Sequence, residues 1–211
     1  MNIVLIGGCN WTGRELIYKL LNEKIKFFVT FLDNLSSELS SRHIMFEFEY
    51  LKGDCFDFKY GDVKDYNFLN SNIQTNSIII YNIWKQPDNI IGMNHISDIM
   101  KHKYIQKVIY TTNESLSNDL NCLIEKKKMN SMVGILYKGE IIGNYNIFNK
   151  RDKIETIKYY KEIQNNTYIN LDFNYFHMKD AICFIYFFLI QPLEDENIII
   201  SQPTKNYLYD I

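Results

Sequence analysis

The sequence contains little proline, few cysteines and almost no net charge, and each shortage excludes a class of protein. Three prolines in 211 residues leave no extended proline-rich linker, and no internal repeat or low-complexity segment divides the chain. The four cysteines are widely spaced and form no Cys-x-x-Cys pair: Cys9, Cys55, Cys122 and Cys183. We therefore expect neither a disulfide framework nor a zinc or other metal site, and a reduced, cytoplasmic setting fits this cysteine usage.

Charge and hydropathy exclude two kinds of partner. The formal net charge is −2 at pH 7, so the chain has no global positive field that would attract nucleic acid. The longest apolar stretch near the C-terminus, Ala181 to Ile190, is too short to cross a bilayer. No basic region precedes the first apolar run, which argues against a signal peptide. We expect a soluble protein with no nucleic-acid partner and no membrane partner.

What the sequence does contain is an alternation of apolar runs and amphipathic segments. Continuous apolar runs predict buried strands, and apolar residues at helical spacing predict helices. The expected strands are Ile3–Ile6, Phe27–Leu32, Phe46–Leu51, Ile78–Ile83, Lys107–Thr112, Met132–Tyr137 and a short final Asn197–Ile200. The expected helices are Gly13–Asn22, Asn89–His102, Leu120–Met129, Ile154–Ile163 and Asp180–Leu189, with Ser36–Arg42 a polar loop or short helix.

Strands separated by helices predict the fold class. Right-handed crossovers between such strands produce an α/β fold with a Rossmann-type doubly wound parallel sheet, covered by helices on both faces. The length of 211 residues fits one domain, or one domain with a small appendage. We expect residues 1–143 to form the Rossmann domain. Residues 144–211 are expected to complete the sheet and add a reduced C-terminal substrate region within the same structural unit.

A glycine-containing turn near the start of the chain points most directly to a ligand. Between the first predicted strand and the first predicted helix lies the run Gly7-Gly8-Cys9-Asn10-Trp11-Thr12-Gly13. A dinucleotide site needs such a turn, because helix N–H groups then point at the pyrophosphate and glycine lets the backbone approach it. Asn10 holds the middle position of the G-x-x-G-x-x-G pattern, where glycine is usual. Asparagine tolerates positive φ better than most residues, so we expect the turn to survive, with this side chain crowding the pyrophosphate or replacing a water.

An acidic residue follows the turn at the spacing that a ribose site requires. Asp33 lies twenty residues beyond Gly13, at the end of the second predicted strand. A carboxylate there can accept a hydrogen bond from a ribose 2′-hydroxyl and would repel a 2′-phosphate, which favours NAD(H) over NADP(H). The alternative is that Asp33 only begins a turn, because Asp33-Asn34-Leu35-Ser36-Ser37 is turn-like in composition. With the glycine turn upstream, we favour the cofactor interpretation.

Further segments follow the turn and the acid in a recognisable order. They are Leu51–Asp57 with a G-D-x-x-D pattern, Asn89–Asn94, Lys107–Thr112, Ile135–Gly143 and Tyr175–Asp180. Together with the turn and Asp33, these segments resemble the extended short-chain dehydrogenase/reductases. More narrowly, they resemble the NAD-dependent epimerase/dehydratase family that includes UDP-glucose 4-epimerase.

The resemblance implies a cofactor, a substrate class and a set of cofactor-binding residues. The cofactor is NAD, and the substrate is a small hydroxylated or keto compound such as a sugar nucleotide. The implied cofactor-binding residues are Gly7, Gly8, Asn10, Trp11, Thr12, Gly13, Asp33, Asn34, Asp54, Cys55, Tyr81, Asn82 and Ile83. Related enzymes often form homodimers through the helices after the fourth and fifth strands, so a homodimer is the assembly that the resemblance implies.

The chain departs from this family where the chemistry takes place. The family's catalytic Tyr-x-x-x-Lys pair lies between the fifth and sixth strands, but no tyrosine occurs between Thr112 and Met132. Thr112 matches a Ser/Thr region that helps to position the substrate, and Tyr137 is a candidate for a tyrosine supplied from elsewhere. Ile83 and Trp84 replace small residues after the fourth strand, so we expect a narrower cofactor groove.

Two hypotheses follow from these departures. The first is an atypical NAD(H)-dependent oxidoreductase or epimerase with an unconventional acid/base, which analogy with the fold favours slightly. The second is a catalytically degenerate dinucleotide-binding sensor or assembly protein on the same scaffold.

Overall fold

Strands and helices alternate through the chain. A computed structural model describes residues 1–23, 26–36, 39–51, 55–83, 87–129, 131–137, 140–142, 175–191 and 198–201. The strands are β1 (Asn2–Ile6), β2 (Phe28–Asp33), β3 (Phe56–Tyr60), β4 (Ser77–Tyr81), β5 (Ile105–Asn113), β6 (Met132–Tyr137), β7 (Glu140–Ile142), β8 (Tyr175–His177) and β9 (Ile198–Ser201). The helices are α1 (Trp11–Asn22), α2 (Leu39–Glu47), the 3-10 helix η1 (Phe48–Leu51), α3 (Tyr66–Asn72), α4 (Asp88–Met100), α5 (Glu114–Lys127) and α7 (Met178–Ile190).

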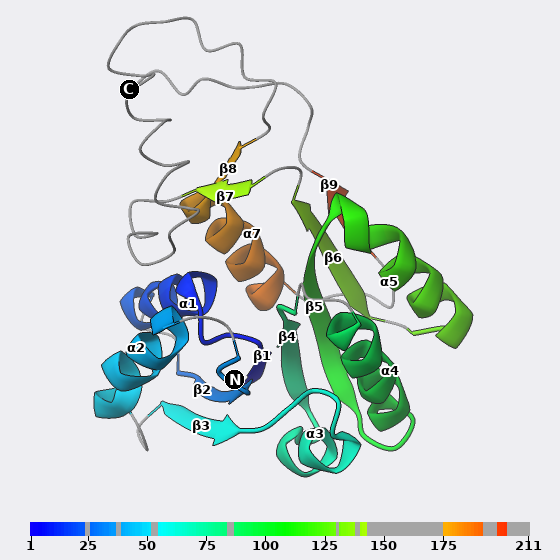
Figure 1. Ribbon diagram of the computed structural model, residues 1–211, viewed down its shortest axis with the longest axis horizontal. Helices are drawn as coiled ribbons and strands as arrows, with labels where there is room; N and C mark the ends of the chain where they lie inside the picture. The colour runs from blue at the N-terminus through cyan, green and yellow to red at the C-terminus, as the bar shows by residue number, and fades with distance from the viewer. Residues whose placement is uncertain are drawn as a thin grey trace, which may run out of the picture.

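Seven parallel strands form the main sheet, in the order β3-β2-β1-β4-β5-β6-β9. β1 lies between β2 and β4, with Ile3 opposite Val29 of β2 on one side and opposite Ile78 of β4 on the other. The chain runs outward from β1 to β3, returns to β4, and continues outward to β6 (Figure 1). β7 and β8 pair in a separate two-stranded parallel sheet. This topology confirms the predicted Rossmann-type doubly wound sheet.

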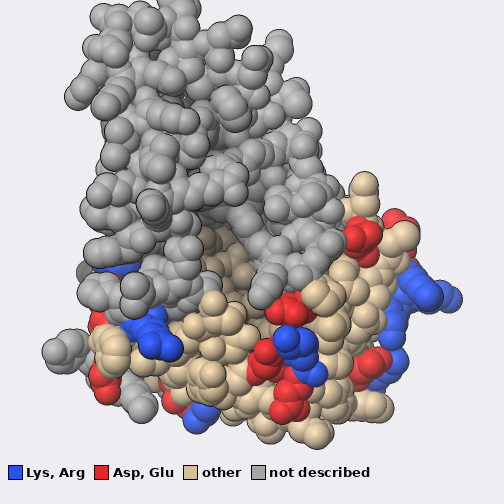
Figure 2. Space-filling view, in the orientation of Figure 1, with Lys and Arg blue, Asp and Glu red and all other residues tan. Residues whose placement is uncertain are grey.

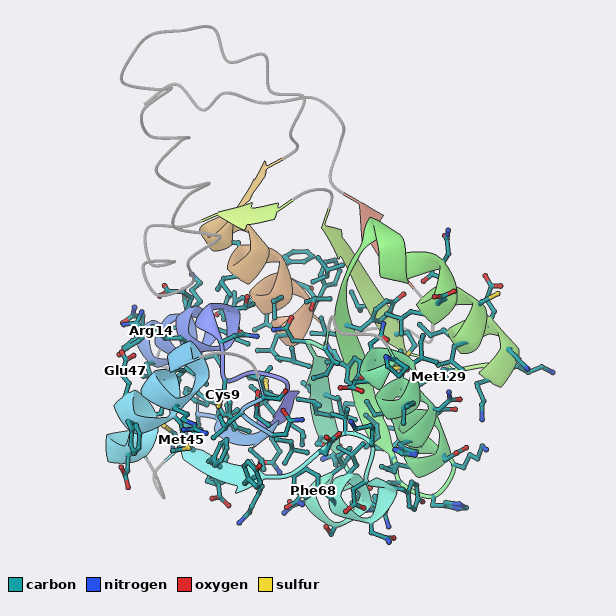
Figure 3. All side chains as sticks on the ribbon, viewed as in Figure 1. Cys9, Arg14, Met45, Glu47, Phe68 and Met129 are labelled. Atoms are coloured by element: carbon teal, nitrogen blue, oxygen red, sulfur yellow. The ribbon has the colours of Figure 1, made fainter. Side chains whose placement is uncertain are left out.

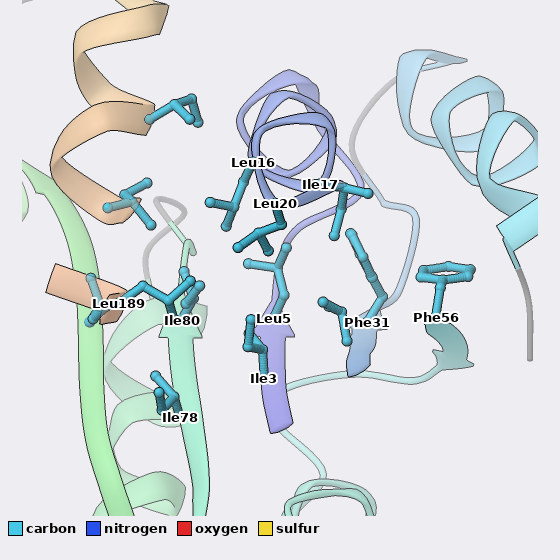
Figure 4. Close-up of a cluster of buried hydrophobic side chains, with 14 of the residues drawn as sticks. Ile3, Leu5, Leu16, Ile17, Leu20, Phe31, Phe56, Ile78, Ile80 and Leu189 are labelled. Atoms are coloured by element: carbon cyan, nitrogen blue, oxygen red, sulfur yellow. The ribbon is translucent and has the colours of Figure 1, made fainter. Parts of the chain in front are cut away.

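Helices cover both faces of the sheet, and each face has its own apolar core. Successive side chains of a strand point to opposite faces. Ile3 and Leu5 of β1 face a layer covered by α1, α2 and α7, whereas Val4 and Ile6 face a layer covered by α3, α4 and α5 (Figure 1). Figure 4 shows the first layer, where Leu16 of α1 points toward the strands. Burial on both faces requires apolar residues at successive positions, which explains the continuous apolar runs.

Two lysines cap the carboxyl ends of helices, where the last carbonyl groups have no partner within the helix. Lys107 of β5 is buried, and its Nζ donates to carbonyl oxygens at the end of α7, including that of Phe188 at 2.8 Å. Lys103 does the same for α3, where its Nζ lies 2.8 Å from the carbonyl oxygen of Ile73. Since the helix dipole favours a cation at a C-terminus, both contacts stabilise the packing of helices on the sheet.

The structure corrects the position of the third strand. Phe46–Leu51 alternates apolar and charged residues and was expected to be this strand, but it forms the end of α2 and η1. The third strand is β3, Phe56–Tyr60, which has the same alternation and pairs with β2 so that Phe56 lies opposite Val29. Two neighbouring segments thus fit one edge position equally well by pattern, and tertiary pairing decides between them. Phe56 is then buried against Phe31, with ring centroids 4.9 Å apart.

Most other expected elements are confirmed, with boundaries that move by a few residues. The expected helices Gly13–Asn22, Asn89–His102, Leu120–Met129 and Asp180–Leu189 correspond to α1, α4, α5 and α7, and the expected final strand corresponds to β9. α3 was not expected, although Asp65 caps it by accepting a hydrogen bond from the N–H of Phe68 at 3.1 Å. The expected helix Ile154–Ile163 lies outside the described residues.

The surface of the described part is mixed in charge. On the face shown in Figure 2, acidic and basic side chains are interspersed rather than gathered by sign. Among the described helices, none combines the length and the apolar character needed to cross a membrane. We consider the sheet edge at the carboxyl ends of the strands for a ligand, because doubly wound sheets bind their ligands there.

Candidate functional site

The order of the strands reverses between β1 and β4, and ligands of doubly wound sheets bind at such a point, beyond the carboxyl ends of the strands. Four strand ends meet here. Gly7 follows β1, Asp33 ends β2, Gly61 follows β3 and Asn82 follows β4. The site is built from these ends and from the turn between β1 and α1.

Two glycines allow the turn between β1 and α1. Gly7 has φ +69°, a region that side chains rarely adopt, and a Cβ there would lie 2.7 Å from the carbonyl oxygen of Asn82. Gly13 lies in the first turn of α1, and a Cβ there would overlap the carbonyl oxygen of Gly8. The helix can start this close to β1 only because both positions lack a side chain.

Asn10 caps α1 and holds the turn closed. Its Oδ1 accepts a hydrogen bond from the N–H of Gly13 at 3.0 Å, and its Nδ2 donates to the carbonyl oxygen of Gly7 at 2.9 Å. Its φ is −141°, so the expectation of a positive φ is wrong. Asparagine is a preferred N-cap residue in extended backbone, which explains how it replaces glycine here. Thr12 is half-buried in the first turn, and the side chain of Trp11 lies outside the described residues.

Contacts between α1 and α2 fix the position of the helix that follows the turn. Arg14 makes two hydrogen bonds to the carboxylate of Glu47, from Nε and Nη2, both at 2.8 Å (Figure 3). The hydroxyl of Tyr18 donates to the same carboxylate at 2.5 Å. Paired, charge-assisted hydrogen bonds of this kind fix the relative orientation of the two groups as well as the distance between them. They fix α1 against α2, so the start of α1 is anchored on the β2 side of the site.

Asp33 joins the end of β2 to the glycine turn. Its Oδ2 accepts from the N–H of Cys9 at 3.0 Å, and its Oδ1 accepts from the N–H of Leu35 at 2.7 Å. Burial raises the pKa of Asp33 above its ordinary value, and these two N–H groups partly offset that effect. A carboxylate has about four acceptor sites, so two hydrogen bonds leave capacity for hydroxyl groups of a ligand. The residue is half-buried at the end of β2, so part of its surface is exposed there.

Asp62 lies beside Asn34, the residue after Asp33, and was not singled out by the sequence patterns. It follows β3 directly, in the run Gly61-Asp62-Val63-Lys64-Asp65, and Nδ2 of Asn34 donates to its Oδ2 at 3.1 Å. Burial acts to raise the pKa of Asp62, but the N–H of Lys64, the amide of Asn34 and the charge of Lys64 together hold it below the ordinary value. The carboxyl group therefore stays ionised at the carboxyl end of β3.

The G-D-x-x-D motif must be moved with the third strand. The pattern occurs twice, at residues 53–57 and again at residues 61–65, and only the second follows β3. Asp54 lies outside the described residues. Cys55 precedes β3, and its carbonyl oxygen accepts from the N–H of Val29 at 2.9 Å, at the end of the strand away from the site. The position of a motif relative to its strand is the signal that distinguishes Asp62 from Asp54.

The ends of β4 and β5 form the other half of the edge, and two of their described polar side chains bind one another. Asn82 is buried, its Nδ2 donates to the carbonyl oxygen of Gly7 at 3.3 Å, and its Oδ1 accepts from the hydroxyl of Thr111 at 2.5 Å. Thr111 is fully buried. Ile83 is half-buried and lies against Gly7, with its Cδ1 only 2.3 Å from where a Cβ of Gly7 would be. This half therefore presents an isoleucine side chain over the turn.

The described tyrosines of this half are unsuited to acid/base chemistry. Tyr81 is fully buried and its hydroxyl donates to the carbonyl oxygen of Asn89 at 2.7 Å; burial raises its pKa. Tyr110 is buried with its hydroxyl 2.9 Å from Oδ1 of Asn121, and burial raises its pKa to about 12. A general acid/base near neutral pH needs a lowered tyrosine pKa. Neither residue meets that need.

The catalytic candidates from the sequence lie at the same edge. Thr112 and Asn113 end β5 and pair with Leu136 and Tyr137 at the end of β6. The side chains of Thr112 and Tyr137 lie outside the described residues. α5 begins at Glu114, directly after β5, so no loop intervenes between β5 and α5.

A buried amide near the start of α4 completes the description of this half. Asn89 is fully buried and its Oδ1 accepts from the N–H of Ile90 at 2.8 Å. Its Nδ2 has no hydrogen-bond partner among the residues that the structure describes. Because this group is completely enclosed, a ligand at the sheet edge does not reach it.

Comparisons with known proteins identify the fold. No protein-family model matches the sequence, and neither does any curated protein. Pen from Bacillus thuringiensis is similar in structure, with a TM-score of 0.68 at 16% identity over 94% of this chain and 70% of that one. A dTDP-glucose 4,6-dehydratase from Bacillus anthracis, solved in complex with NAD, has a TM-score of 0.67 at 14% identity over 95% of this chain and 75% of that one.

A third solved structure belongs to the group that the sequence resembles. UDP-glucose 4-epimerase from Thermotoga maritima, solved with UDP-glucose, has a TM-score of 0.65 at 12% identity over 96% of this chain and 76% of that one. At such low identities the likeness concerns the fold alone. The chain therefore has the fold of the nucleotide-sugar epimerases and dehydratases, which is the fold that the sequence resemblance implies.

Proposed function

We propose that the chain binds an adenine dinucleotide, NAD(H), across the reversal point between β1 and β4. The observation that carries this proposal is the placement of Asp33, whose carboxylate is held against the glycine turn by the N–H of Cys9. One carboxylate and one helix N-terminus then lie side by side. They are suited to the ribose hydroxyls and the pyrophosphate of the same molecule.

The residues fit the adenosine part of this cofactor. Gly7 and Gly13 let the turn and α1 pack closely on the strand ends. The N-terminus of α1 therefore lies at the sheet edge, where the helix dipole favours an anion. Asp33 and Asp62 place two negative charges at the ends of β2 and β3, which oppose a 2′-phosphate and favour NAD(H) over NADP(H). The NAD complex of the dehydratase with the same fold supports this proposal by analogy.

Between the two hypotheses for activity, we favour a dinucleotide-binding protein without the usual chemistry. The sequence has no tyrosine between Thr112 and Met132, and Tyr81 and Tyr110 are buried with raised pKa values. The second candidate is an atypical oxidoreductase or epimerase acting on a small hydroxylated or keto compound, such as a sugar nucleotide. It is favoured by the fold and by Tyr137, which pairs with Asn113 at the candidate edge.

Calorimetric titration of the purified chain with NAD⁺, NADH and NADP⁺ tests the proposal. We expect NAD⁺ and NADH to bind and to raise the melting temperature by mass action, and NADP⁺ to bind at least about tenfold more weakly because of the two carboxylates. Absence of NAD⁺ and NADH binding at millimolar concentration would overturn it. Hydride transfer to or from a sugar nucleotide, lost in Tyr137→Phe, would favour the enzyme over the non-catalytic protein.

A further inference from the structure

The two halves of the candidate site differ in what they offer a ligand. A dinucleotide on a doubly wound sheet spans two mononucleotide halves. We call the part of the site beyond β1, β2 and β3 the adenosine half, and the part beyond β4, β5 and β6 the nicotinamide half. We propose, on the basis of the function proposed above, that this site recognises the adenosine diphosphate part alone. Nucleotides that share this part then bind with similar affinity, whether or not they carry nicotinamide.

The adenosine half keeps polar groups that a ligand can reach. Asp33, Asn34 and Asp62 are all half-buried, and they lie together because Nδ2 of Asn34 donates to Asp62 and the N–H of Gly61 donates to the carbonyl oxygen of Asp33 at 3.2 Å. The carboxylates have acceptor capacity left, which suits ribose hydroxyls and the exocyclic amine of adenine. This half can therefore bind both the sugar and the base.

The turn supplies the diphosphate position. α1 is a 12-residue helix whose N-terminus opens at the sheet edge, so its dipole favours an anion there. The Asn10 side chain occupies the N–H of Gly13 and lies across the turn toward Gly7. A diphosphate would therefore bind at the start of the helix, next to Asp33. The Asn10 and Ile83 side chains lie between this position and the β4 side of the site.

In the nicotinamide half, the two described polar side chains at the ends of β4 and β5 bond within the protein. Asn82 is 8% exposed and Thr111 is not exposed, and they hydrogen-bond each other. Nδ2 of Asn82 is directed to the carbonyl oxygen of Gly7. The polar groups of these two described side chains are thus used within the protein and are not offered to a nicotinamide ribose.

Ile83 adds a steric element to this half. Its Cδ1 lies against Gly7, so an apolar side chain covers the turn on the side that faces β4. A second nucleotide half would have to displace it. The class of ligand that fits is an adenine nucleotide with a diphosphate and a free 2′-hydroxyl, of which NAD⁺, ADP-ribose and ADP are members.

Calorimetry with three probes tests this inference in the whole chain. NAD⁺, ADP-ribose and nicotinamide mononucleotide are titrated separately. We expect the dissociation constants of NAD⁺ and ADP-ribose to agree within fivefold, and nicotinamide mononucleotide to show no binding at millimolar concentration. A preference for NAD⁺ of more than fivefold, or binding of nicotinamide mononucleotide, would overturn the inference and leave the proposed function intact. If neither NAD⁺ nor ADP-ribose binds, the proposed function itself fails.

A substitution tests the steric part of the inference. Ile83→Ala removes the side chain over Gly7, so we expect the preference for NAD⁺ over ADP-ribose to rise at least threefold. Ile90→Ala is the matched control, because Ile90 is also half-buried and packs in the same layer as Ile83. An unchanged preference in folded Ile83→Ala, or an equal change in Ile90→Ala, would show that Ile83 does not exclude the nicotinamide half.

Discussion

The strand ends on the two sides of the reversal point use similar side chains in opposite ways. Beyond β2 and β3, Asp33 and Asp62 accept hydrogen bonds mainly from backbone N–H groups and remain half-exposed. Beyond β4 and β5, Asn82 and Thr111 hydrogen-bond each other and are buried. A polar group that is buried must be paired, whereas one at the surface keeps capacity for a ligand.

The comparison shows how polar side chains at one part of the sheet edge can be buried and paired without loss of the fold. Replacing a ligand contact by an internal hydrogen bond satisfies the buried groups, so the sheet keeps its packing while the surface closes. The glycine turn belongs to both halves, since Gly7 contacts Asn82 and Ile83 on one side and leads to Asp33 through Cys9 on the other. Substitutions in the turn should therefore have the largest effects.

Gly13→Ala is expected to have the largest effect. A Cβ at this position would overlap the carbonyl oxygen of Gly8, so α1 must move away from β1. We expect the free energy of unfolding to fall by about 3 kcal/mol, measured by urea denaturation. Asn10→Ala in the same turn removes the cap and the hydrogen bond to Gly7 without adding a clash, and should cost about 1 kcal/mol. Equal stability of Gly13→Ala and the native chain would contradict the close approach.

Asp33→Asn is expected to weaken NAD⁺ binding by about 30-fold, because a hydrogen bond to a charged acceptor contributes about 2 kcal/mol. Asp57→Asn is the matched control, since Asp57 lies on β3 and pairs with Lys59 at 2.8 Å. Its affinity for NAD⁺ should not change. A loss of affinity shared by both variants would remove Asp33 from the site.

The same carboxyl group predicts a pH dependence of binding. The ionised form of Asp33 accepts hydrogen bonds from hydroxyls more strongly than the protonated form, and burial raises its pKa. Affinity for NAD⁺ should therefore fall as the pH decreases, beginning at a higher pH than an ordinary aspartate would require. Asp33→Asn should show a flatter profile over the same range. A profile that is identical in the two proteins would assign the titration to another group.

Asp62→Asn should have a smaller effect on nucleotide affinity, because it only replaces a charged carboxylate at the end of β3 by a neutral amide. We expect affinity for ADP-ribose to fall about fivefold, equivalent to about 1 kcal/mol. Asp65→Asn, three residues later, changes the cap of α3 and should alter stability alone. If the affinity follows Asp65 rather than Asp62, the revised motif position is wrong.

Asn82→Leu is expected to have the smallest effect on binding. It removes one partner from Thr111 and one from the carbonyl oxygen of Gly7, so unfolding should be about 1 kcal/mol easier. The affinity for ADP-ribose should change by less than about threefold. Asn82 is buried and already paired, so a ligand at the sheet edge would not contact it. The double variant Asn82→Leu, Thr111→Val should be less destabilised than the sum of the single variants. A large loss of affinity would place Asn82 within the ligand site.

The sheet could be predicted from the sequence because its strands are buried on both faces. Ile3–Ile6 and Met132–Tyr137 read as continuous apolar runs, and no other element explains such runs at this length. The third strand could not be placed, because Phe46–Leu51 and Phe56–Tyr60 have the same alternation. Only the pairing of Phe56 with Val29, and the use of Glu47 by Arg14, separates them.

The site was predictable in part for a similar reason. Gly7, Gly13 and Asp33 have spacings that follow from local geometry, so the sequence shows them directly. The role of Asn10 was missed because asparagine suits both positive φ and an N-cap, and the preference of helices for an asparagine cap was the stronger signal. The bond between Asn82 and Thr111 joins two strands, so it depends on tertiary packing that local pattern does not show.

The most direct test of the account is the set of backbone amide shifts in a ¹⁵N-labelled chain saturated with NAD⁺. We predict large shifts for the amides of Gly8, Cys9 and Gly13 and for those at the ends of β2 and β3. The amides of Ile83 and Thr111 should shift much less. Shifts that are confined to the ends of β4 and β5, or an unchanged spectrum, would contradict a site built on the glycine turn and Asp33.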